Sequence, residues 1–435
     1  MRKSPETVVA ALFRNLSLFS FLCVIGCNSN DLSPNPQGIA PSAAESDRIN
    51  PDGKLSRALV FTGGGFQTAV FIGILDGLQS QGWSPDVIVS TCGSSLANAI
   101  INAFPDASKR KRFLESQAFH QILLTAKMNE SEGAPLLKNF AAMLTGSLST
   151  DLSTSTENAL FDFSSFSIPQ LFQGALMSVP SDFGSSELNK PFETSGIRSV
   201  MTGARLYFGP VSQGKPIQRY DRIYQEVFLT DILTGAMLKR FQSPLAKGLN
   251  HVMSPTDTLT QVSLSQAARI SISDPYYMEP VMPQNDGYYY IGGSIDLYPL
   301  EAAHQLADEV IMSFSGEFDI VEQAAIATSF GYNNNQRVRE VHDQSAEHWV
   351  DISDSSDVYH RYGMNPTPSL SRSHLVEVPF GVPEYHEFVR RVRALYDYGF
   401  ERGAEAATTP VNGKCHARFM SKNNTSEELR QQCGR

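Results

Sequence analysis

The sequence predicts an α/β fold with a mainly parallel central sheet flanked by helices, and two observations carry this prediction. Residues 57–62, RALVFT, form a short apolar run that three glycines end, and apolar residues at helical spacing follow the glycines. The segments PDVIVS and SSLANAIINAF then repeat the same order of strand and helix. Because two successive strand-then-helix units imply a parallel sheet covered by helices, the pattern defines the fold class.

The individual elements follow from local patterns. The first expected helix lies within FQTAVFIGILDGLQSQG, where Val70, Ile74 and Leu78 share a face and Gly82 stands just past the end. The alternating segments ARLYFGPV and YQEVFLTD predict two strands joined by a turn that contains Gly214. The run EVIMSFS predicts a further strand in the interior of the sheet.

One more helix is expected near the C-terminus. The segment YHEFVRRVRALYDYGFERGAEAA places Phe388, Val392, Leu395 and Tyr396 on one face, which is typical of an amphipathic helix. We expect this helix to dock on the main domain.

Composition restricts the class of protein. The chain has 435 residues, of which 41% are hydrophobic and 18% charged, so it has enough apolar material for a sizeable core. The formal net charge of −10 offers no electrostatic footprint for nucleic acid, which we exclude as a partner. No His, Cys, Asp or Glu set falls at recognised ligand spacing, so no metal and no cofactor are predicted.

The N-terminus carries an export signal. Arg2 and Lys3 precede an apolar run over residues 16–25 that is too short to span a bilayer. The following VIGC resembles the lipobox of bacterial lipoproteins, and the resemblance implies that residues 1–26 are removed and that Cys27 is lipidated. A plain secretory signal with an incidental cysteine is the alternative. Residues 27–56, rich in Ser, Pro, Asn and Gly, are predicted to be a flexible tether. The expected location is therefore the cell envelope, with a lipid anchor in a bacterial membrane.

The rest of the chain is divided by its patterns. Residues 57–315 carry the α/β signals, and the looser residues 108–203 within them are either a lid facing the substrate or a helical insertion whose aromatic residues are core. Residues 316–435 are predicted to be a helical extension with a polar tail. Cys415 and Cys433 in that tail either form a disulfide or remain thiols. Cys92 is expected to pack as a small buried residue, because no cationic neighbour in the sequence favours its thiolate.

Residues 93–97, GSSLA, fit the nucleophile pattern G-x-S-x-G with alanine in the last position. In such an elbow a serine occupies a strained turn between strand and helix, and its neighbours must be small. This spacing selects Ser95 as the nucleophile, with the amino end of the following helix able to stabilise an oxyanion. The competing interpretation is a set of ordinary small residues at a strand-to-helix junction.

The glycine run upstream supports the elbow. Gly63, Gly64, Gly65 and Phe66 leave a strand and open a helix, and their backbone N–H groups suit an oxyanion hole. A dinucleotide-binding fingerprint is the rival interpretation. It fails because Thr68 stands where a third glycine is required.

On these motifs the chain resembles the patatin-like phospholipases. The glycine run is similar to the G-G-G-x-R-G loop of that family, and residues 93–97 are similar to its elbow. QAARISISDPYYMEPV looks like the family's A-x-x-A-S-x-S-x-P segment, and YYYIGGSIDLYPLEAA looks like its Y-x-D-G-G motif. The resemblance implies a patatin-like three-layer fold, a Ser–Asp dyad and hydrolysis of phospholipid or other acyl lipids.

The departures from this pattern concern the base. Gln67 and Thr68 replace the arginine and glycine of the loop, and Ile291 stands where the family has its catalytic Asp. Isoleucine cannot accept a proton, so the base is not identified and Asp296 is the leading candidate. Asp296 is also placed to cap the helix expected in LYPLEAAHQLA, which we favour over a catalytic role.

Two functions are compatible with these motifs. The first is a membrane-anchored lipid acyl hydrolase that uses Ser95. The second is a patatin-fold lipoprotein with impaired catalysis that binds lipid or envelope partners, because the position of the dyad Asp is Ile291. The oligomeric state is not predicted.

Overall fold

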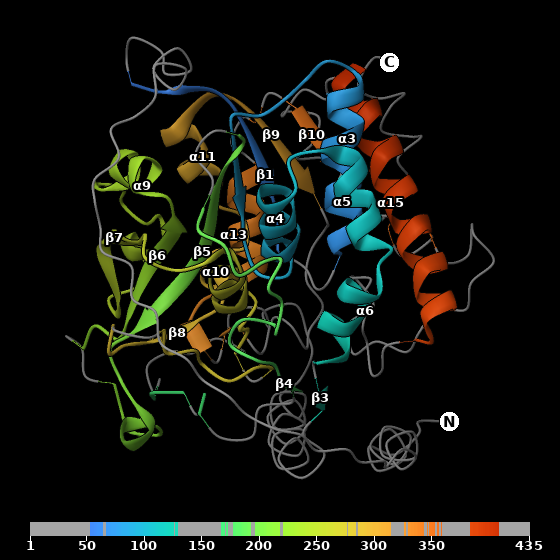
Figure 1. The fold of residues 1–435 in the computed structure, drawn as a ribbon. Coiled ribbons are helices and arrows are strands. Elements are labelled where there is room, and N and C mark those ends of the chain that lie inside the picture. The colour runs from blue at the N-terminus through green and yellow to red at the C-terminus, as the bar shows by residue number, and fades with distance from the viewer. Residues whose placement is uncertain are drawn as a thin grey trace, which may run out of the picture.

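The computed structural model defines an α/β protein with strands and helices that alternate along much of the chain (Figure 1). It describes residues 53–63, 67–125, 127–128, 167–169, 171–172, 177–192, 196–217, 221–275, 277–283, 286–314, 326–327, 329–342, 346, 348–352, 355, 358 and 383–408. Cys27, Gly64, Gly65, Phe66, Cys415 and Cys433 lie outside the described residues.

A mixed sheet forms the centre of the protein. Its strands are β1 (Leu55–Phe61), β2 (Val87–Ser90), β5 (Arg198–Leu206), β6 (Tyr224–Thr230), β7 (Val252–Leu259), β8 (Tyr289–Ile291), β9 (Ala307–Phe314) and β10 (His348–Asp351). Their order is β10-β9-β1-β2-β5-β6-β7, and β8 also pairs with β5. The strands from β10 to β5 are mutually parallel, whereas β6 and β8 run antiparallel to β5.

Helices cover both faces of the sheet. They are α3 (Thr68–Ser80), α4 (Ser94–Ala103), α5 (Ala107–Leu114), α6 (Gln117–Leu124), α9 (Ile232–Leu238), α10 (Leu264–Ser271), α11 (Leu300–Leu306), α13 (Asn334–His342) and α15 (Tyr385–Thr408). Short elements complete the described chain: the pair β3 (Lys127–Met128) and β4 (Met177–Ser178), and the 3-10 turns η2 (Pro210–Ser212), η3 (Leu245–Lys247) and η4 (Gly293–Ile295).

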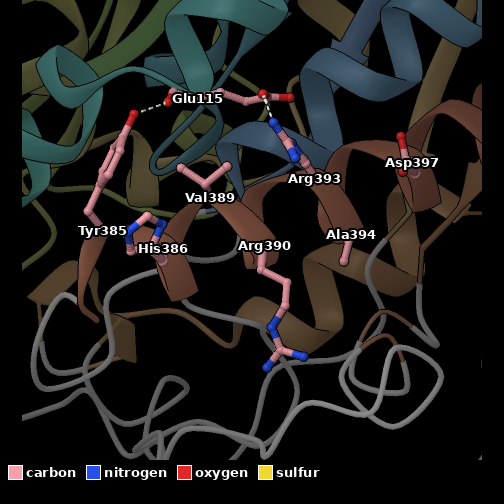
Figure 2. A pocket seen from close by; sticks show the side chains of 8 residues that line it. All are labelled: Glu115, Tyr385, His386, Val389, Arg390, Arg393, Ala394 and Asp397. Atoms are coloured by element: carbon pink, nitrogen blue, oxygen red, sulfur yellow. Dashed lines mark hydrogen bonds and ion pairs between the residues drawn. The ribbon is translucent and has the colours of Figure 1, made fainter.

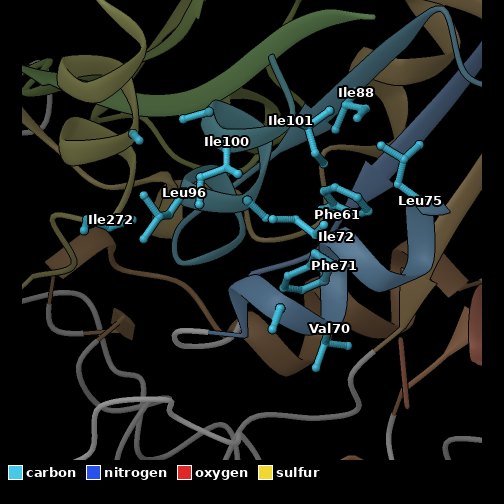
Figure 3. Packing of buried hydrophobic residues seen from close by; sticks show 14 of the residues in the cluster. Phe61, Val70, Phe71, Ile72, Leu75, Ile88, Leu96, Ile100, Ile101 and Ile272 are labelled. Carbon is cyan, nitrogen blue, oxygen red and sulfur yellow. The ribbon is translucent and has the colours of Figure 1, made fainter. Parts of the chain in front are cut away.

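Strand β1 shows why both faces are buried. Leu59 and Phe61 pack in one apolar cluster with α3, α4, α10 and α15, as Figure 3 shows in part. Ala58 and Val60 pack in the other cluster, with α9, α11 and α13. Because successive side chains of a strand point to opposite faces, a continuous apolar run requires a layer of helices on each side. The predicted α/β fold with a mainly parallel sheet flanked by helices is confirmed.

Helix α15 packs closely against α3 through glycines. A Cβ on Gly73 would lie 2.2 Å from the carbonyl oxygen of Tyr396, and one on Gly399 would lie 2.1 Å from that of Val70. These glycines, with Gly77 and Gly403 one turn further on, let the two backbones touch. The predicted docking of this helix is confirmed, with Phe388 buried at its start.

Elements from both sides of residue 315 share the central sheet and its helical layers. β10 pairs in parallel with β9, and α15 covers the face that α3 and α4 also cover. The strand expected in YQEVFLTD is found as β6, whereas the strand expected in ARLYFGPV ends at Leu206 as the last part of β5, and the two strands pair antiparallel. No helix among the described residues is long and apolar enough to cross a membrane.

Candidate active site

The turn between β2 and α4 lies at the carboxyl edge of the sheet, where ligands of α/β proteins bind. β2 pairs with the first part of β5, ending at Ser90 opposite Met201, and β8 pairs with the last part, with Ile291 opposite Ala204. The end of β2 and the end of β8 therefore face each other along the same side of β5.

Cys92 occupies the strained position of this turn. Its φ is +54°, a left-handed conformation that costs a non-glycine residue about 1 kcal/mol or more. Its N–H donates to Ser271 Oγ at 3.1 Å, which holds the turn in place from α10. The geometry expected of a nucleophile elbow is thus found at Cys92. The G-x-S-x-G pattern then falls on residues 90–94, with Ser90 and Ser94 as the small flanking residues.

The thiol of Cys92 has a carboxylate partner. Its Sγ donates to Asp274 Oδ2 at 2.7 Å. Asp274 follows α10, and its carbonyl oxygen accepts from the N–H groups of Tyr277 and Met278, so the acid sits in a hydrogen-bonded turn. A nucleophile in contact with a base is the arrangement that covalent catalysis requires.

The glycine pair after β8 allows this site to close. A Cβ on Gly292 would lie 2.8 Å from Asp274 Oδ1, and one on Gly293 would lie 2.8 Å from Cys92 N and 2.3 Å from Thr91 Oγ1. Gly292 also donates its N–H to the carbonyl oxygen of Ser273 at 2.8 Å. Side chains at these two positions would displace the base or the elbow.

Arg269 holds the loop that carries Asp274. Its guanidinium is buried and donates to Ser273 Oγ and, at 3.1 Å, to the carbonyl oxygen of Val179. Burial lowers the pKa of Arg269 to about 10, so the side chain stays charged at neutral pH. Arg269 thereby links the segment around β4 to the loop of the base.

Ser95 lies within the first turn of α4, beyond the strained position. Its Oγ is fully buried and contacts Ser271 Oγ at 2.7 Å and Ser90 Oγ at 3.1 Å. Ser90 donates its one hydroxyl proton to the carbonyl oxygen of Val200, so it accepts from Ser95. The proton of Ser95 is then used, and Ser95 accepts from Ser271. Among the described residues its side-chain partners are hydroxyls, and no carboxylate is one of them.

Asp296 is engaged elsewhere. Its buried carboxylate pairs with Arg337 at 3.0 Å and accepts from the N–H of Tyr298 at 3.0 Å. Burial raises the pKa of Asp296, and the Arg337 guanidinium opposes that shift. The predicted cap is wrong: α11 begins at Leu300, its N-cap is Pro299, and no side chain caps it. The reason is the Arg337 partner, which holds the carboxylate in the core.

The backbone of Asp296 does contribute to the elbow. The Thr91 hydroxyl reaches the carbonyl oxygens of Gly293, at 2.7 Å, and of Asp296, at 2.9 Å. The residue before Cys92 is thus held by the segment that follows β8. Asp296 therefore meets the elbow through its main-chain carbonyl, whereas its carboxylate, the candidate base, pairs with Arg337.

A buried acid on β6 lies in the charged cluster that contains Asp296 and Arg337. Glu226 is fully buried, and burial, with the neighbouring Asp296, raises its pKa to about 8. The Tyr332 hydroxyl, buried in the same cluster, donates to the carbonyl oxygen of Ile295 at 2.7 Å. Sequence reasoning missed this cluster, because the side chains come from three distant segments.

The structure describes Gly63, at the start of the glycine run, and Gln67, just after it. The N–H of Gly63 donates to the carbonyl oxygen of Leu297 at 3.1 Å, so this amide is not directed at a substrate. A Cβ there would lie 2.1 Å from Leu297 Cδ2, which explains the glycine. Gln67 is the N-cap residue of α3 and is 1% exposed, and its side-chain amide has no hydrogen-bond partner within the described part of the chain.

Ile291 supplies no base, because its side chain is a hydrocarbon. Its side chain is fully buried in the apolar cluster that also contains Cys92. The signal that sequence reasoning overlooked is a cysteine just past the end of β2, together with the acid in the segment SISDPYY. Both lie inside the recognised motifs, at positions other than Ser95 and Ile291.

Other features do not compete with this site. A hollow of about 630 Å³ lies along α15, where Tyr385 donates to the carbonyl oxygen of Glu115 and Arg393 pairs with the Glu115 carboxylate (Figure 2). The described residues that line it include no serine, threonine or cysteine. The described residues also contain no group of His, Cys, Asp and Glu side chains that could hold a metal ion.

No model of a protein family matches the chain, and a comparison with curated proteins gives no match. Among solved structures, the crystal structure of VipD from Legionella pneumophila is similar to this chain with a TM-score of 0.30 and 12% sequence identity. The similarity covers 82% of this chain and 69% of that chain. A likeness of this degree carries no argument about activity, so the function is argued from the site.

Proposed function

We propose that this protein is a thiol-dependent acyl hydrolase that cleaves carboxylic esters of phospholipids or other acyl lipids. The observation that carries the proposal is the contact between Cys92 Sγ and Asp274 Oδ2 at a turn where Cys92 has a positive φ. Ser95 does not take this role in the proposal, because its hydroxyl has other hydroxyls as partners.

The reaction begins with transfer of the thiol proton to Asp274 as sulfur attacks the ester carbonyl carbon. An unperturbed thiol titrates near pH 8.5, so a carboxylate removes its proton more easily than that of an alcohol. The carbonyl oxygen becomes an oxyanion at the amino end of α4, close to the Gly93 amide. Collapse of this intermediate breaks the C–O bond, and protonated Asp274 gives its proton to the departing alcohol.

A thioester on Cys92 remains after the alcohol leaves. Asp274 then removes a proton from water, and the resulting hydroxide equivalent attacks the thioester carbon. The second tetrahedral intermediate expels the thiolate, which regains a proton from Asp274. The products are one alcohol and one carboxylic acid, and the enzyme returns to its starting state.

The lipid substrate is inferred from the resemblance to the patatin-like motifs and from the expected lipid anchor at Cys27. We propose that the protein acts at the bacterial membrane that holds this anchor. Replacing Cys27 by Ser is expected to leave the precursor unprocessed or the protein released from membranes. A Cys27→Ser variant that is processed as before and still fractionates with membranes would count against the anchor.

The thioester gives the direct test of the enzyme. Purified protein is mixed with a short-chain p-nitrophenyl ester, quenched in acid and digested for mass spectrometry. We expect an acyl adduct on the peptide that contains Cys92, removable by neutral hydroxylamine, and none in Cys92→Ala. An adduct on Ser95 would transfer the role of nucleophile back to that residue.

A second candidate function is a lipid-binding protein that has lost catalysis. The observation in its favour is that Cys92 is only 4% exposed. This function predicts binding of lipid vesicles with no acyl adduct and no ester turnover under the same conditions.

A further inference from the structure

Exposed apolar side chains gather at the end of the sheet where the elbow lies. Seven large apolar residues are exposed among those described, namely Leu124, Tyr207, Val211, Ile232, Leu233, Met282 and Tyr288. Four of them, Tyr207, Val211, Met282 and Tyr288, lie on turns that follow β5 or precede β8. Ile232 and Leu233 lie at the start of α9, which follows the opposite end of the β5–β6 pair (Figure 1).

The four residues belong to neighbouring turns. The rings of Tyr207 and Tyr288 have centroids 5.4 Å apart. A backbone bridge between Val281 and Tyr290 brings Met282 beside β8. Val211 lies in η2, in the turn that leaves β5, and is 85% exposed. We call these four residues the apolar rim.

One cation beside the apolar rim, Arg205, is neutralised by its neighbours. The guanidinium of Arg205 lies over the ring of Tyr288, 5.0 Å from its centroid. The same group pairs with Asp257 at 2.6 Å and lies 4.0 Å from Asp286. The chain as a whole has a net charge of −10. This net charge disfavours anionic surfaces, so apolar contact is the driving force that the four rim residues offer.

The apolar rim is connected to the candidate site through β8. Tyr288 precedes β8 directly, and β8 leads into Gly292 and Gly293, which lie against Asp274 and Cys92. Gly293 lies five residues after Tyr288, at most about 18 Å of extended chain, so a surface on the apolar rim would meet the end of the sheet that carries the elbow.

We propose that the apolar rim inserts into the surface of a zwitterionic phospholipid bilayer and orients the site toward its lipid substrate; this inference rests on the proposed hydrolase function. The rim residues lie on separate turns, with Val211 almost fully exposed in η2. Such an arrangement suits insertion of single side chains between lipids. Tyrosine suits the headgroup level, because its ring is apolar and its hydroxyl is polar.

Tryptophan fluorescence tests this orientation in the full chain. Both native tryptophans, Trp83 and Trp349, are buried and give a constant background. Val211→Trp and Ile232→Trp place a reporter at two exposed positions on opposite ends of the β5–β6 pair. Both variants carry Cys92→Ala, so that lipid is not consumed, and both are mixed with vesicles of brominated phosphatidylcholine.

We expect the tryptophan introduced at position 211 to lose roughly half of its fluorescence or more and to shift to shorter wavelength, as burial at the acyl boundary requires. The reporter at position 232 keeps its signal. An N-terminal anchor affects both variants equally, so the difference reports orientation alone. Tyr288→Trp gives a second reporter on the apolar rim if the first variant does not fold.

Equal quenching at both positions, or none at either, would overturn the inference. A shift at position 211 that depends on protein concentration and not on brominated lipid would show instead that a second copy covers the rim. Turnover of a soluble ester tests the hydrolase separately. Turnover without quenching would support the proposed hydrolase and contradict insertion of the apolar rim into a bilayer. Unchanged turnover in Cys92→Ala would contradict the proposed hydrolase.

Discussion

Cys92 donates its thiol hydrogen to Asp274 across 2.7 Å, at a turn where its own backbone is left-handed. Ser95 lies on the same turn of chain and is directed into a row of serine hydroxyls. The two residues thus have different roles, one chemical and one structural, and each role predicts a different result on substitution.

Replacing Cys92 by Ala should abolish ester turnover and change the melting temperature little, because the backbone N–H of residue 92 still donates to Ser271 Oγ. Replacing Ser95 by Ala should do the reverse. It leaves the buried hydroxyl of Ser271 without an acceptor, at a cost of about 1–3 kcal/mol in the free energy of unfolding. Both variants are compared by turnover per folded molecule and by urea unfolding. Loss of turnover in Ser95→Ala at unchanged stability would contradict this assignment.

Asp274→Asn should lower kcat by roughly 10²–10⁴-fold, the usual contribution of a general base, with little effect on KM. An amide keeps the shape of the side chain and cannot accept the thiol proton. Asp296→Asn serves as the comparison, since its carboxylate pairs with Arg337 and should affect stability before turnover. The measurement is steady-state kinetics on a soluble ester. Equal kcat in Asp274→Asn and wild type would remove Asp274 as the base.

Stability should fall with rising pH because of Glu226. Its pKa in the folded state is raised to about 8, above its ordinary value of 4.5. A raised pKa means that folding favours the protonated acid, so its contribution to stability is complete below about pH 4.5 and is lost as the pH approaches 8. Burial also raises the pKa of Asp296, which acts in the same direction.

Glu226→Gln removes the titration of this residue and should flatten the dependence on pH. Urea unfolding should therefore show that the free energy of unfolding falls less from pH 5 to pH 8 in the variant than in the wild type. This range lies within the window between the two pKa values. An equally steep loss of stability with pH in both proteins would show that Glu226 does not cause the pH dependence.

Gly399→Ala should destabilise the protein although alanine favours a helix over glycine by about 1 kcal/mol. Its Cβ would lie 2.1 Å from the carbonyl oxygen of Val70, so α15 must move away from α3. We expect a net loss of about 1–3 kcal/mol in the free energy of unfolding. Gly248→Ala is the matched control, since nothing lies within 4 Å of a Cβ there. A gain in stability for Gly399→Ala would contradict the close packing of these helices.

Much of the fold could be predicted from local pattern. β1, β2 and the helices after them come from apolar periodicity that reports which face of each element is buried. The contacts of α15 with α3 could not be predicted in this way. They depend on glycines in both helices, which matter only when the two backbones meet.

The location of the site could be predicted from the sequence, but the residues that make its contacts could not. The small residues around the turn after β2 and the glycine pair after β8 indicate where chemistry is possible. Matching the motif by residue type selects Ser95 as the nucleophile. The turn itself is set by where β2 ends, and that places Cys92 in the left-handed position.

By itself, then, the sequence determined the order of strands and helices, the buried faces of β1 and β2, and the edge of the sheet that carries the elbow. These depend on periodicity and chain direction, which are properties of neighbouring residues. Only the tertiary structure decided that Cys92 meets Asp274 and that Asp296 meets Arg337. Each of these pairs joins residues far apart in the chain, and contact between them exists only once α10 and α13 have packed against the sheet.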